Sequence, residues 1–297
     1  MAEADKDTVE IPGPGRSVAS SSIQVDMYGL SHPGRVRPNN EDYFLVARFG
    51  RTMRTLLTNL PSGEVPEQSS ETLYGFAVAD GMGGEAAGEV ASRTALRTMI
   101  DLVLQTPDWI LCLDEQFIGE VGRRMERRFR LIHDTLVDLA RADPKLFGMG
   151  TTMTLAVSHG ADLLVIHVGD SRAYLFRKEE LMRLTRDQTL AQELADAGVI
   201  RPEEVATHPL RHRLTGAIST KLGEVRAELS SFALADGDQL LLCTDGLTDM
   251  VPDHVIAEVL RRGDPAADAC RALLNRALTQ GGKDNVTVVL ARYDIPP

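Results

Sequence analysis

Residues 74–92, YGFAVADGMGGEAAGEVAS, join an apolar run to a carboxylate, a glycine-rich corner and a stretch of small residues. The apolar run predicts a buried strand that ends at Asp80, and the small residues predict a helix over about 85–105. Gly83 and Gly84 allow the chain to turn tightly between these two elements. A strand that ends on a carboxylate beside such a corner is typical of either a phosphate cradle or a metal site.

The same placement of aspartate recurs along the chain. LLVIHVGD ends on Asp170, LLLCTD ends on Asp245, and Asp284 directly precedes the final apolar run in KDNVTVVL. A rigid strand end projects its carboxylate from the rim of a sheet, so these residues and Asp80 indicate one shared site. Close carboxylates stay ionised only beside compensating positive charge, and Mg²⁺ and Mn²⁺ prefer oxygen ligands. The pattern therefore predicts a divalent-metal centre.

Histidines and cysteines are not arranged as a ligand set for zinc. His167 lies within a predicted strand, and His208 and His212 lie in a polar segment, so we interpret each as structural or solvent-facing. Cys243 lies within an apolar run, which favours a place in the core.

The segment RVRPNNEDYF adds Arg37, Glu41 and Asp42 at the head of a predicted strand. A Glu-Asp pair alone is usually a solvated pair. An arginine near a carboxylate-rich metal centre is more informative, because its guanidinium can hold a phosphate through two parallel hydrogen bonds. Metal ions, carboxylates and one such arginine together predict hydrolysis of a phosphate ester.

An alternative interpretation of the glycine-rich corner is a dinucleotide-binding fingerprint. Gly81, Gly83 and Ala86 match G-x-G-x-x-G/A after a strand, and Asp101 lies 20 residues past Gly81. That interpretation places Asp80 where it would repel a pyrophosphate and leaves the other strand-end aspartates unexplained. We therefore favour the metal site.

Composition limits the remaining classes of function. The chain has 297 residues and a net charge of −11, an acidic balance that disfavours nucleic-acid binding. Its three cysteines (Cys112, Cys243 and Cys270) include no C-x-x-C pair, which indicates a reducing compartment. Residues 1–22 predict a flexible tail without a signal peptide, and no apolar stretch predicts a membrane span. The expected location is the cytoplasm.

The predicted elements follow the order strands, helices, strands, helices and strand, which favours an α+β fold over a regular parallel sheet. The residues at 50–73 are rich in turn formers and predict an exposed hairpin or loop. Strands are expected at 23–30, 41–49, 73–80, 151–158, 162–170, 172–177, 226–234, 238–246 and 285–293, and helices at 85–105, 117–139, 252–263 and 265–280.

The motifs along the chain resemble the bacterial form of a known family, the metal-dependent Ser/Thr protein phosphatases of the PPM (PP2C) type. The resemblance covers about residues 24–293. Its motifs occur in the order typical of the family, and the complete set of motifs is highly specific for that family. They are VRPNNEDYF, VADGMGGEAAGEVAS, GMGTTMT, HVGDSRAYLFR, LTRDQT, LTGAIST, LLLCTDGLTD and GGKDNVTVV.

The resemblance implies a four-layer α-β-β-α sandwich, in which two antiparallel sheets are flanked by helices. It implies one phosphatase domain over 23–295, with residues 185–220 as a flap beside the active site. Arg211, His212 and Arg213 give this flap positive charge that could guide a phosphopeptide, or the flap could be a solvated loop.

The resemblance also implies a ligand set for two Mn²⁺ or Mg²⁺ ions. Asp80 is expected to bridge the ions, the Gly81 carbonyl to bind one of them, and Asp245 and Asp284 to complete the second. Asp170, with Asp245, matches a third, weaker site of the family.

Four further residues are expected around these ligands. Glu41 and Asp42 match residues that act through metal-bound waters, Arg37 matches the phosphate-binding arginine, and Asp249 is expected just outside the ligands. Met82 stands where some members carry a histidine proposed to protonate the leaving group, so the donor of that proton is unassigned.

The implied activity is hydrolysis of phosphoserine and phosphothreonine in proteins by a metal-bridging hydroxide, which reverses the action of a Ser/Thr kinase. The expected partners are phosphorylated proteins, such a kinase among them. The alternative is a catalytically silent member that binds phosphoproteins as a regulator. The presence of Asp80, Asp245 and Asp284 favours an active enzyme.

Overall fold

The structure is a computed structural model that describes residues 23–83, 87–105, 115–223 and 225–296. The predicted tail at 1–22 lies outside these ranges, as do Cys112 and the Ala86 of the dinucleotide pattern. For residues 115–118 the structure describes the helical backbone alone.

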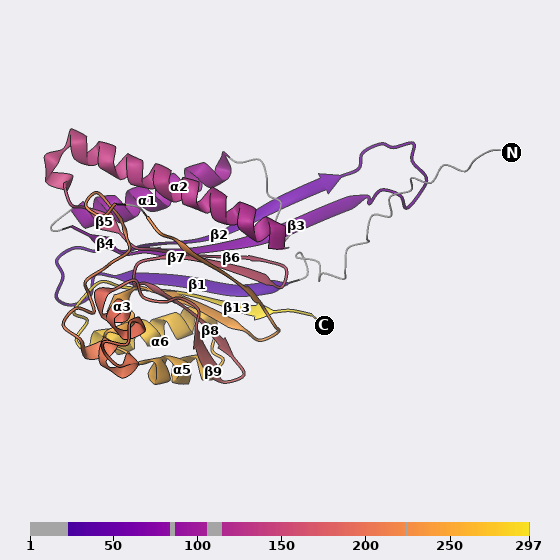
Figure 1. Ribbon diagram of the computed structural model, residues 1–297. Coiled ribbons are helices and arrows are strands. Elements are labelled where there is room, and N and C mark those ends of the chain that lie inside the picture. Colours follow the sequence, from indigo (N-terminus) through magenta and orange to yellow (C-terminus); the bar gives the residue numbers. More distant parts are fainter. Residues whose placement is uncertain (1–22, 84–86, 106–114, 224, 297) are drawn as a thin grey trace.

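Two five-stranded antiparallel sheets form the middle of the molecule (Figure 1). The first sheet has the order β1 (Gln24–His32), β13 (Val286–Asp294), β12 (Gln239–Cys243), β8 (Arg172–Arg177) and β9 (Glu180–Arg183). The second has the order β11 (Glu228–Ala233), β7 (Asp162–Val168), β6 (Met153–His159), β3 (Gln68–Ala79) and β2 (Tyr43–Arg54).

The sheets pack face to face, and helices cover their outer faces (Figure 1). In β3, Phe76 and Val78 point into the apolar layer between the sheets, whereas Ala77 and Ala79 point toward the helices. This alternation follows from the two-residue period of a strand that is buried on both faces. The predicted four-layer α+β sandwich is confirmed.

Helices α1 (Ala87–Leu104) and α2 (Glu115–Ala142) cover the second sheet, and α5 (Asp253–Arg261) and α6 (Ala266–Thr279) cover the first. Helix α2 includes the helix predicted over 117–139, and its apolar side chains at Met125, Phe129, Ile132 and Leu136 are buried. Ala87, Ala91 and Ala95 are buried on α1, where small side chains allow close packing. No helix within the described ranges is long and apolar enough to cross a membrane.

The predicted hairpin at 50–73 is confirmed and is longer than expected. Strands β2 and β3 pair without interruption from Tyr43↔Ala79 to Arg54↔Gln68. Because β6 pairs with β3 only between Leu73 and Val78, the far end of the hairpin is two-stranded and projects from the sandwich (Figure 1). Leu56 and Leu57 are 82% and 96% exposed beyond the ends of its strands.

A third, small sheet that the sequence did not predict joins the glycine-rich corner to the end of the 185–220 segment. It has the order β10 (Ile218–Ser219), β5 (Gly150–Thr151) and β4 (Gly81–Met82). The 185–220 segment itself contains α3 (Leu190–Asp196) and a 3-10 turn at Pro202–Thr207. Each strand of the small sheet has two residues, too few to produce a periodic pattern.

Candidate metal centre

Asp80 directly follows β3, and its backbone is bonded on both sides. Its N–H donates to Thr152 Oγ1 at 3.0 Å, and its carbonyl accepts from Thr152 N and Thr151 Oγ1, each at 2.9 Å. Both threonines are buried. The backbone of Asp80 is therefore fixed, while its carboxylate takes part in none of these bonds.

The glycines of the corner permit close approach of the chain. A Cβ on Gly81 would lie 2.2 Å from the Gly88 carbonyl oxygen, and a Cβ on Gly88 would lie 2.3 Å from Glu41 Oε2. Gly81 N also donates to the Glu41 carbonyl at 3.2 Å. These contacts bring the start of α1 and the segment before β2 against Asp80.

Gly81→Ala is expected to lower the free energy of unfolding by about 1–3 kcal/mol, the usual cost of forcing extra volume into a packed site. The added methyl would meet backbone, which cannot rotate away. Gly223→Ala is the matched control, because nothing lies within 4 Å of a Cβ at that position. Urea unfolding of both variants measures the effect, and equal midpoints for the two would refute the packing argument.

Asp42 lies in the interior of the site and is 3% exposed. Its Oδ2 accepts from Thr244 Oγ1 and Thr287 Oγ1, both at 2.8 Å, whereas its Oδ1 is buried without a hydrogen-bond partner. Burial, together with the charges of Asp245 and Asp284, raises the pKa of Asp42 to about 7, although the two hydrogen bonds act to lower it. A buried acceptor without a partner is a place where a cation or its bound water would supply the missing interaction.

The predicted strand-end aspartates gather around this position, and together with Asp42 we call them the carboxylate cluster. Burial raises the pKa of Asp80 well above its usual range, and the charges of Asp42, Asp245, Asp170 and Asp284 raise it further. The pKa of Asp170 is likewise raised by burial and then by Asp245. Mutual repulsion among oxygen ligands is what divalent cations relieve, so the cluster fits Mg²⁺ or Mn²⁺.

Arg37 and Asp284 pair at the edge of the cluster. Arg37 Nη2 lies 2.7 Å from Asp284 Oδ2, with the two side chains 56% and 39% exposed. Hydrogen bonding to Asp284 raises the pKa of Arg37, so its charge is retained at any ordinary pH. The exposed guanidinium of Arg37 is accessible to an anion from solvent.

Asn285 is a positioning residue that the sequence analysis missed. Its Oδ1 accepts from Glu41 N at 2.8 Å, and its Nδ2 donates to the carbonyls of Pro33 and Asn39 at 2.9 and 2.8 Å. It thereby attaches the segment that carries Arg37 and Glu41 to the start of β13. Its place directly after Asp284 was the sequence feature that could have indicated this role.

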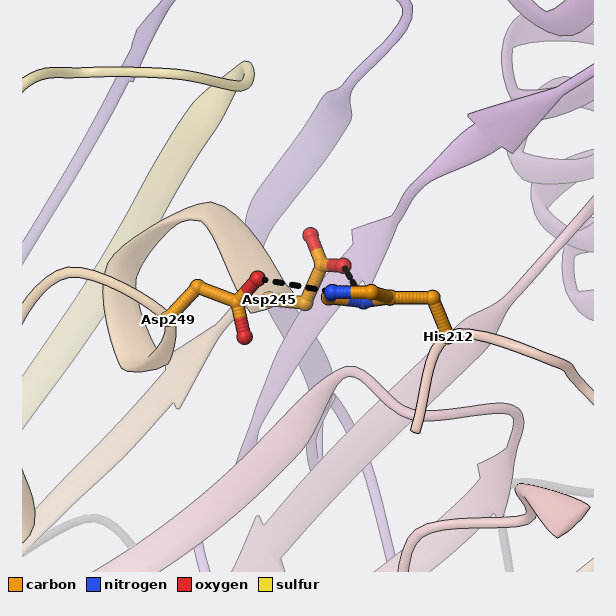
Figure 2. Close-up of side chains that lie close together, drawn as sticks. All are labelled: His212, Asp245 and Asp249. Atoms are coloured by element: carbon orange, nitrogen blue, oxygen red, sulfur yellow. Dashed lines mark ion pairs between the residues drawn. The ribbon is translucent and has the colours of Figure 1, made fainter. Parts of the chain in front are cut away.

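Asp245 and Asp249 lie one turn apart in the short helix α4 (Asp245–Thr248) and its C-terminal cap, because Asp249 N donates to the Asp245 carbonyl at 2.8 Å. His212 of the 185–220 segment lies between their carboxylates (Figure 2). Its Nδ1 is 3.7 Å from Asp245 Oδ2, and its Nε2 is 3.4 Å from Asp249 Oδ2. Interpreting His212 as structural or solvent-facing did not anticipate this contact.

Other sequence interpretations are confirmed away from the cluster. His167 is buried and bonds to Thr154 Oγ1 at 2.9 Å, as expected for a structural histidine. Cys243 is fully buried, and burial raises the pKa of its thiol to about 12, so it is a core residue.

The structure also accounts for the corner that resembled a dinucleotide fingerprint. Gly83 has a positive φ of 141°, and a Cβ there would lie 2.8 Å from Met149 Cα. Gly81 and Met82 form strand β4, which pairs with β5. The glycines therefore serve packing against neighbouring backbone, and the carboxylate of Asp80 belongs to the cluster.

The chain thus forms a two-sheet sandwich with a carboxylate cluster and a neighbouring arginine. The sequence profile of protein phosphatase 2C matches residues 66–290, and the chain belongs to that family.

Relatives of known name support this assignment. The chain is 38% identical over 233 residues to the serine/threonine protein phosphatase PstP of Mycobacterium tuberculosis, a match that covers 77% of this chain and 43% of PstP. It is 33% identical over 274 residues to the protein phosphatase PhpP of Streptococcus pneumoniae, covering 88% of this chain and 94% of PhpP. The chain thus matches less than half the length of the mycobacterial relative.

A solved structure shares the fold. The catalytic domain of PstP in complex with 2 manganese ions superposes with a TM-score of 0.70 at 34% identity, covering 92% of this chain and 100% of that domain.

Proposed function

We propose that this protein hydrolyses phosphoserine and phosphothreonine in proteins with the help of divalent metal ions. The convergence of Asp42, Asp80, Asp170, Asp245 and Asp284 on one site is the observation that carries the proposal. The names of the relatives, which are protein phosphatases, agree with it. In the reaction, water attacks phosphorus, the bond from phosphorus to the serine or threonine oxygen breaks, and inorganic phosphate and the free hydroxyl are released.

The cluster offers ligands for two Mn²⁺ or Mg²⁺ ions, as PstP binds two manganese ions. In our assignment, Asp80 would be a ligand of both ions, the Gly81 carbonyl a ligand of one, and Asp245 and Asp284 ligands of the other. When bound, the ions would supply an acidified water as the nucleophile and would neutralise charge on the phosphoryl group. Asp170 is assigned to a third, weaker site together with Asp245.

The remaining residues position water and phosphate. Asp42 accepts from two threonine hydroxyls through Oδ2, which leaves Oδ1 to accept from a water. Glu41 is placed beside it by Asn285 and is assigned the same kind of role. The guanidinium of Arg37 would bind the phosphate through bidentate hydrogen bonds. Its pairing with Asp284 keeps it at the rim until an anion arrives.

The leaving oxygen needs a proton, and Met82 has none to give at the corner. We leave that donor unassigned. Because no residue of the chain needs to carry the phosphoryl group, Cys243 is not required as a nucleophile, in agreement with its buried thiol.

The organisation of the chain completes the proposal. We assign residues 23–295 to one phosphatase domain and residues 185–220 to a flap beside the metal centre. The physiological substrates are proposed to be phosphorylated proteins, with a Ser/Thr kinase among them, so that the enzyme reverses kinase action.

Turnover of p-nitrophenyl phosphate and of a phosphothreonine peptide is expected with Mn²⁺ and is expected to vanish in EDTA. The reason is that the cluster cannot activate water without a cation to balance its charge. Steady-state rates before and after chelation, followed by Mn²⁺ restoration, provide the measurement. Circular dichroism serves as the control that the chelated protein remains folded. A folded protein without Mn²⁺-dependent turnover would favour the silent phosphoprotein-binding alternative.

A further inference from the structure

A cavity of about 160 Å³ lies between the second sheet and the two helices that cover it, α1 and α2 (Figure 1). Its inner end is lined by buried apolar side chains, among them Leu164 and Ile166 of β7 and Met99 of α1. Its outer end lies near Val103 of α1 and Val121 of α2, which are only partly buried. The cavity therefore has an apolar interior and an end close to solvent.

The cavity exists because small residues of the sheet face the helices at this position. Phe76 points into the layer between the two sheets, so its neighbours Gly75 and Ala77 face α1 and α2. Gly75 pairs with Val157 of β6, and both residues line the cavity. A glycine and short side chains leave unfilled the volume that larger residues would occupy.

Two arginines of α2 supply the polar part of the lining. Among the described residues that line the cavity, Arg124 and Arg128 carry the only polar side chains. Arg124 is 25% exposed, and its Nη2 lies 3.4 Å from Glu120 Oε1, whereas Arg123 lies closer to Glu120, at 2.9 Å. Arg128 Nη1 lies 3.6 Å from Sδ of Met125, another lining residue. This contact places the guanidinium of Arg128 against the apolar wall.

The charges of these arginines favour an anion beside them. Burial lowers the pKa of Arg128, and the charge of Arg124 lowers it further. The two residues are four positions apart on one helix, where like charges repel. A carboxylate would reduce this repulsion and compensate the desolvation, and it can accept two parallel hydrogen bonds from a guanidinium.

We propose that this cavity binds a small apolar carboxylate, with the apolar part inside the cavity and the carboxylate at Arg124 and Arg128. The volume limits the apolar part, because a cavity of about 150 Å³ with a similar lining holds one benzene ring. The site is separate from the metal centre and goes beyond the proposed function. Gly75 precedes Asp80 by five residues of extended chain, which span about 17 Å.

The test titrates 3-phenylpropionate into the Mn²⁺-loaded full chain and measures its Kd by isothermal titration calorimetry. Val157→Phe places a ring beside Gly75 and fills the cavity, whereas the matched control Val199→Phe adds the same ring at a position that is 66% exposed. Arg128→Gln removes one of the two charges, and Arg127→Gln is its control because Arg127 is exposed on the same helix. Cooperative thermal unfolding confirms that each variant is folded.

Two further arms separate this cavity from the metal centre and the charge from the ring. The titration is repeated in EDTA, because the described lining contains no carboxylate or imidazole that would hold a metal ion. It is also repeated with 3-phenylpropanamide, which keeps the ring and replaces the carboxylate by a neutral amide.

We expect binding to the wild type that EDTA leaves unchanged. The amide, and 3-phenylpropionate with Arg128→Gln, are expected to bind about 10-fold more weakly or worse, as for the loss of charge-assisted hydrogen bonds. Val157→Phe is expected to abolish binding, and both controls to retain it. The proposal is overturned by absence of binding to the wild type, by loss of binding in EDTA or by unchanged affinity in folded Val157→Phe. If Val157→Phe does not fold, equal affinities for the amide and the acid overturn it.

Discussion

Asp80→Asn reduces turnover of p-nitrophenyl phosphate by at least about 100-fold at saturating Mn²⁺ if our assignment of the bridging ligand is correct. Even the loss of a group that only supports a metal ligand costs roughly 10–100-fold, and Asp80 lies at the centre of the cluster, where four other carboxylates raise its pKa. Steady-state kinetics over a range of Mn²⁺ concentrations provide the measurement.

The matched control is Asp162→Asn, which removes an exposed carboxylate at the opposite end of β7 from Asp170. It is expected to leave turnover unchanged. In EDTA, Asp80→Asn is also expected to unfold at a higher temperature than the wild type, because folding no longer requires this site to bury a charge or to take up a proton. Near-normal turnover of Asp80→Asn at high Mn²⁺, in protein that unfolds cooperatively, would show that the ligand assignment is wrong.

The metal-free protein is expected to lose stability as the pH rises from about 5 to 7.5. The pKa of Asp42 is raised to about 7 in the folded protein, and those of Asp80 and Asp170 are also raised. The folded state therefore retains protons that the unfolded chain has already released, and stability falls with pH wherever the folded state binds more protons. Thermal unfolding in EDTA across this pH range measures the slope.

Saturating Mn²⁺ is expected to reverse the sign of this slope. Metal ligands must be deprotonated, so protons compete with the ion at low pH and stability rises with pH. Asp42→Asn is expected to flatten the slope measured in EDTA, whereas Asp162→Asn leaves it unchanged. A metal-free protein whose unfolding temperature increases over this pH range would contradict the electrostatic description of the cluster.

Local sequence patterns predicted the elements whose burial is regular. The stripe that includes Phe129, Ile132 and Leu136 predicted α2, and these residues are fully buried. The apolar runs before Asp80, Asp170 and Asp245 predicted strands, because strands buried on both faces have nearly continuous apolar sequence. The small sheet of β4, β5 and β10 was missed, since two-residue strands carry no period and depend on the segments around them.

Local sequence patterns did not predict contacts between residues that are far apart in the chain. Asn285 accepts from Glu41 N across 244 residues, and nothing in KDN specifies that partner. His212 follows an arginine in a polar segment, which is typical of a solvated loop, yet the fold places its ring between two carboxylates. The orphaned Oδ1 of Asp42 also depends on which groups the completed fold places around it.

The sequence by itself determined the strands and the strand-end aspartates, because strand periodicity and ligand chemistry are encoded in neighbouring residues. It indicated the family and the two-sheet architecture through the resemblance of its motifs to a known family. Only the tertiary structure decided that those carboxylates lie together in one desolvated site. It also decided that Asn285 positions the neighbouring segment and that His212 of the 185–220 segment reaches Asp245 and Asp249. The physical reason is that desolvation and Coulomb repulsion depend on distances in space, which the packing of both sheets and their helices sets.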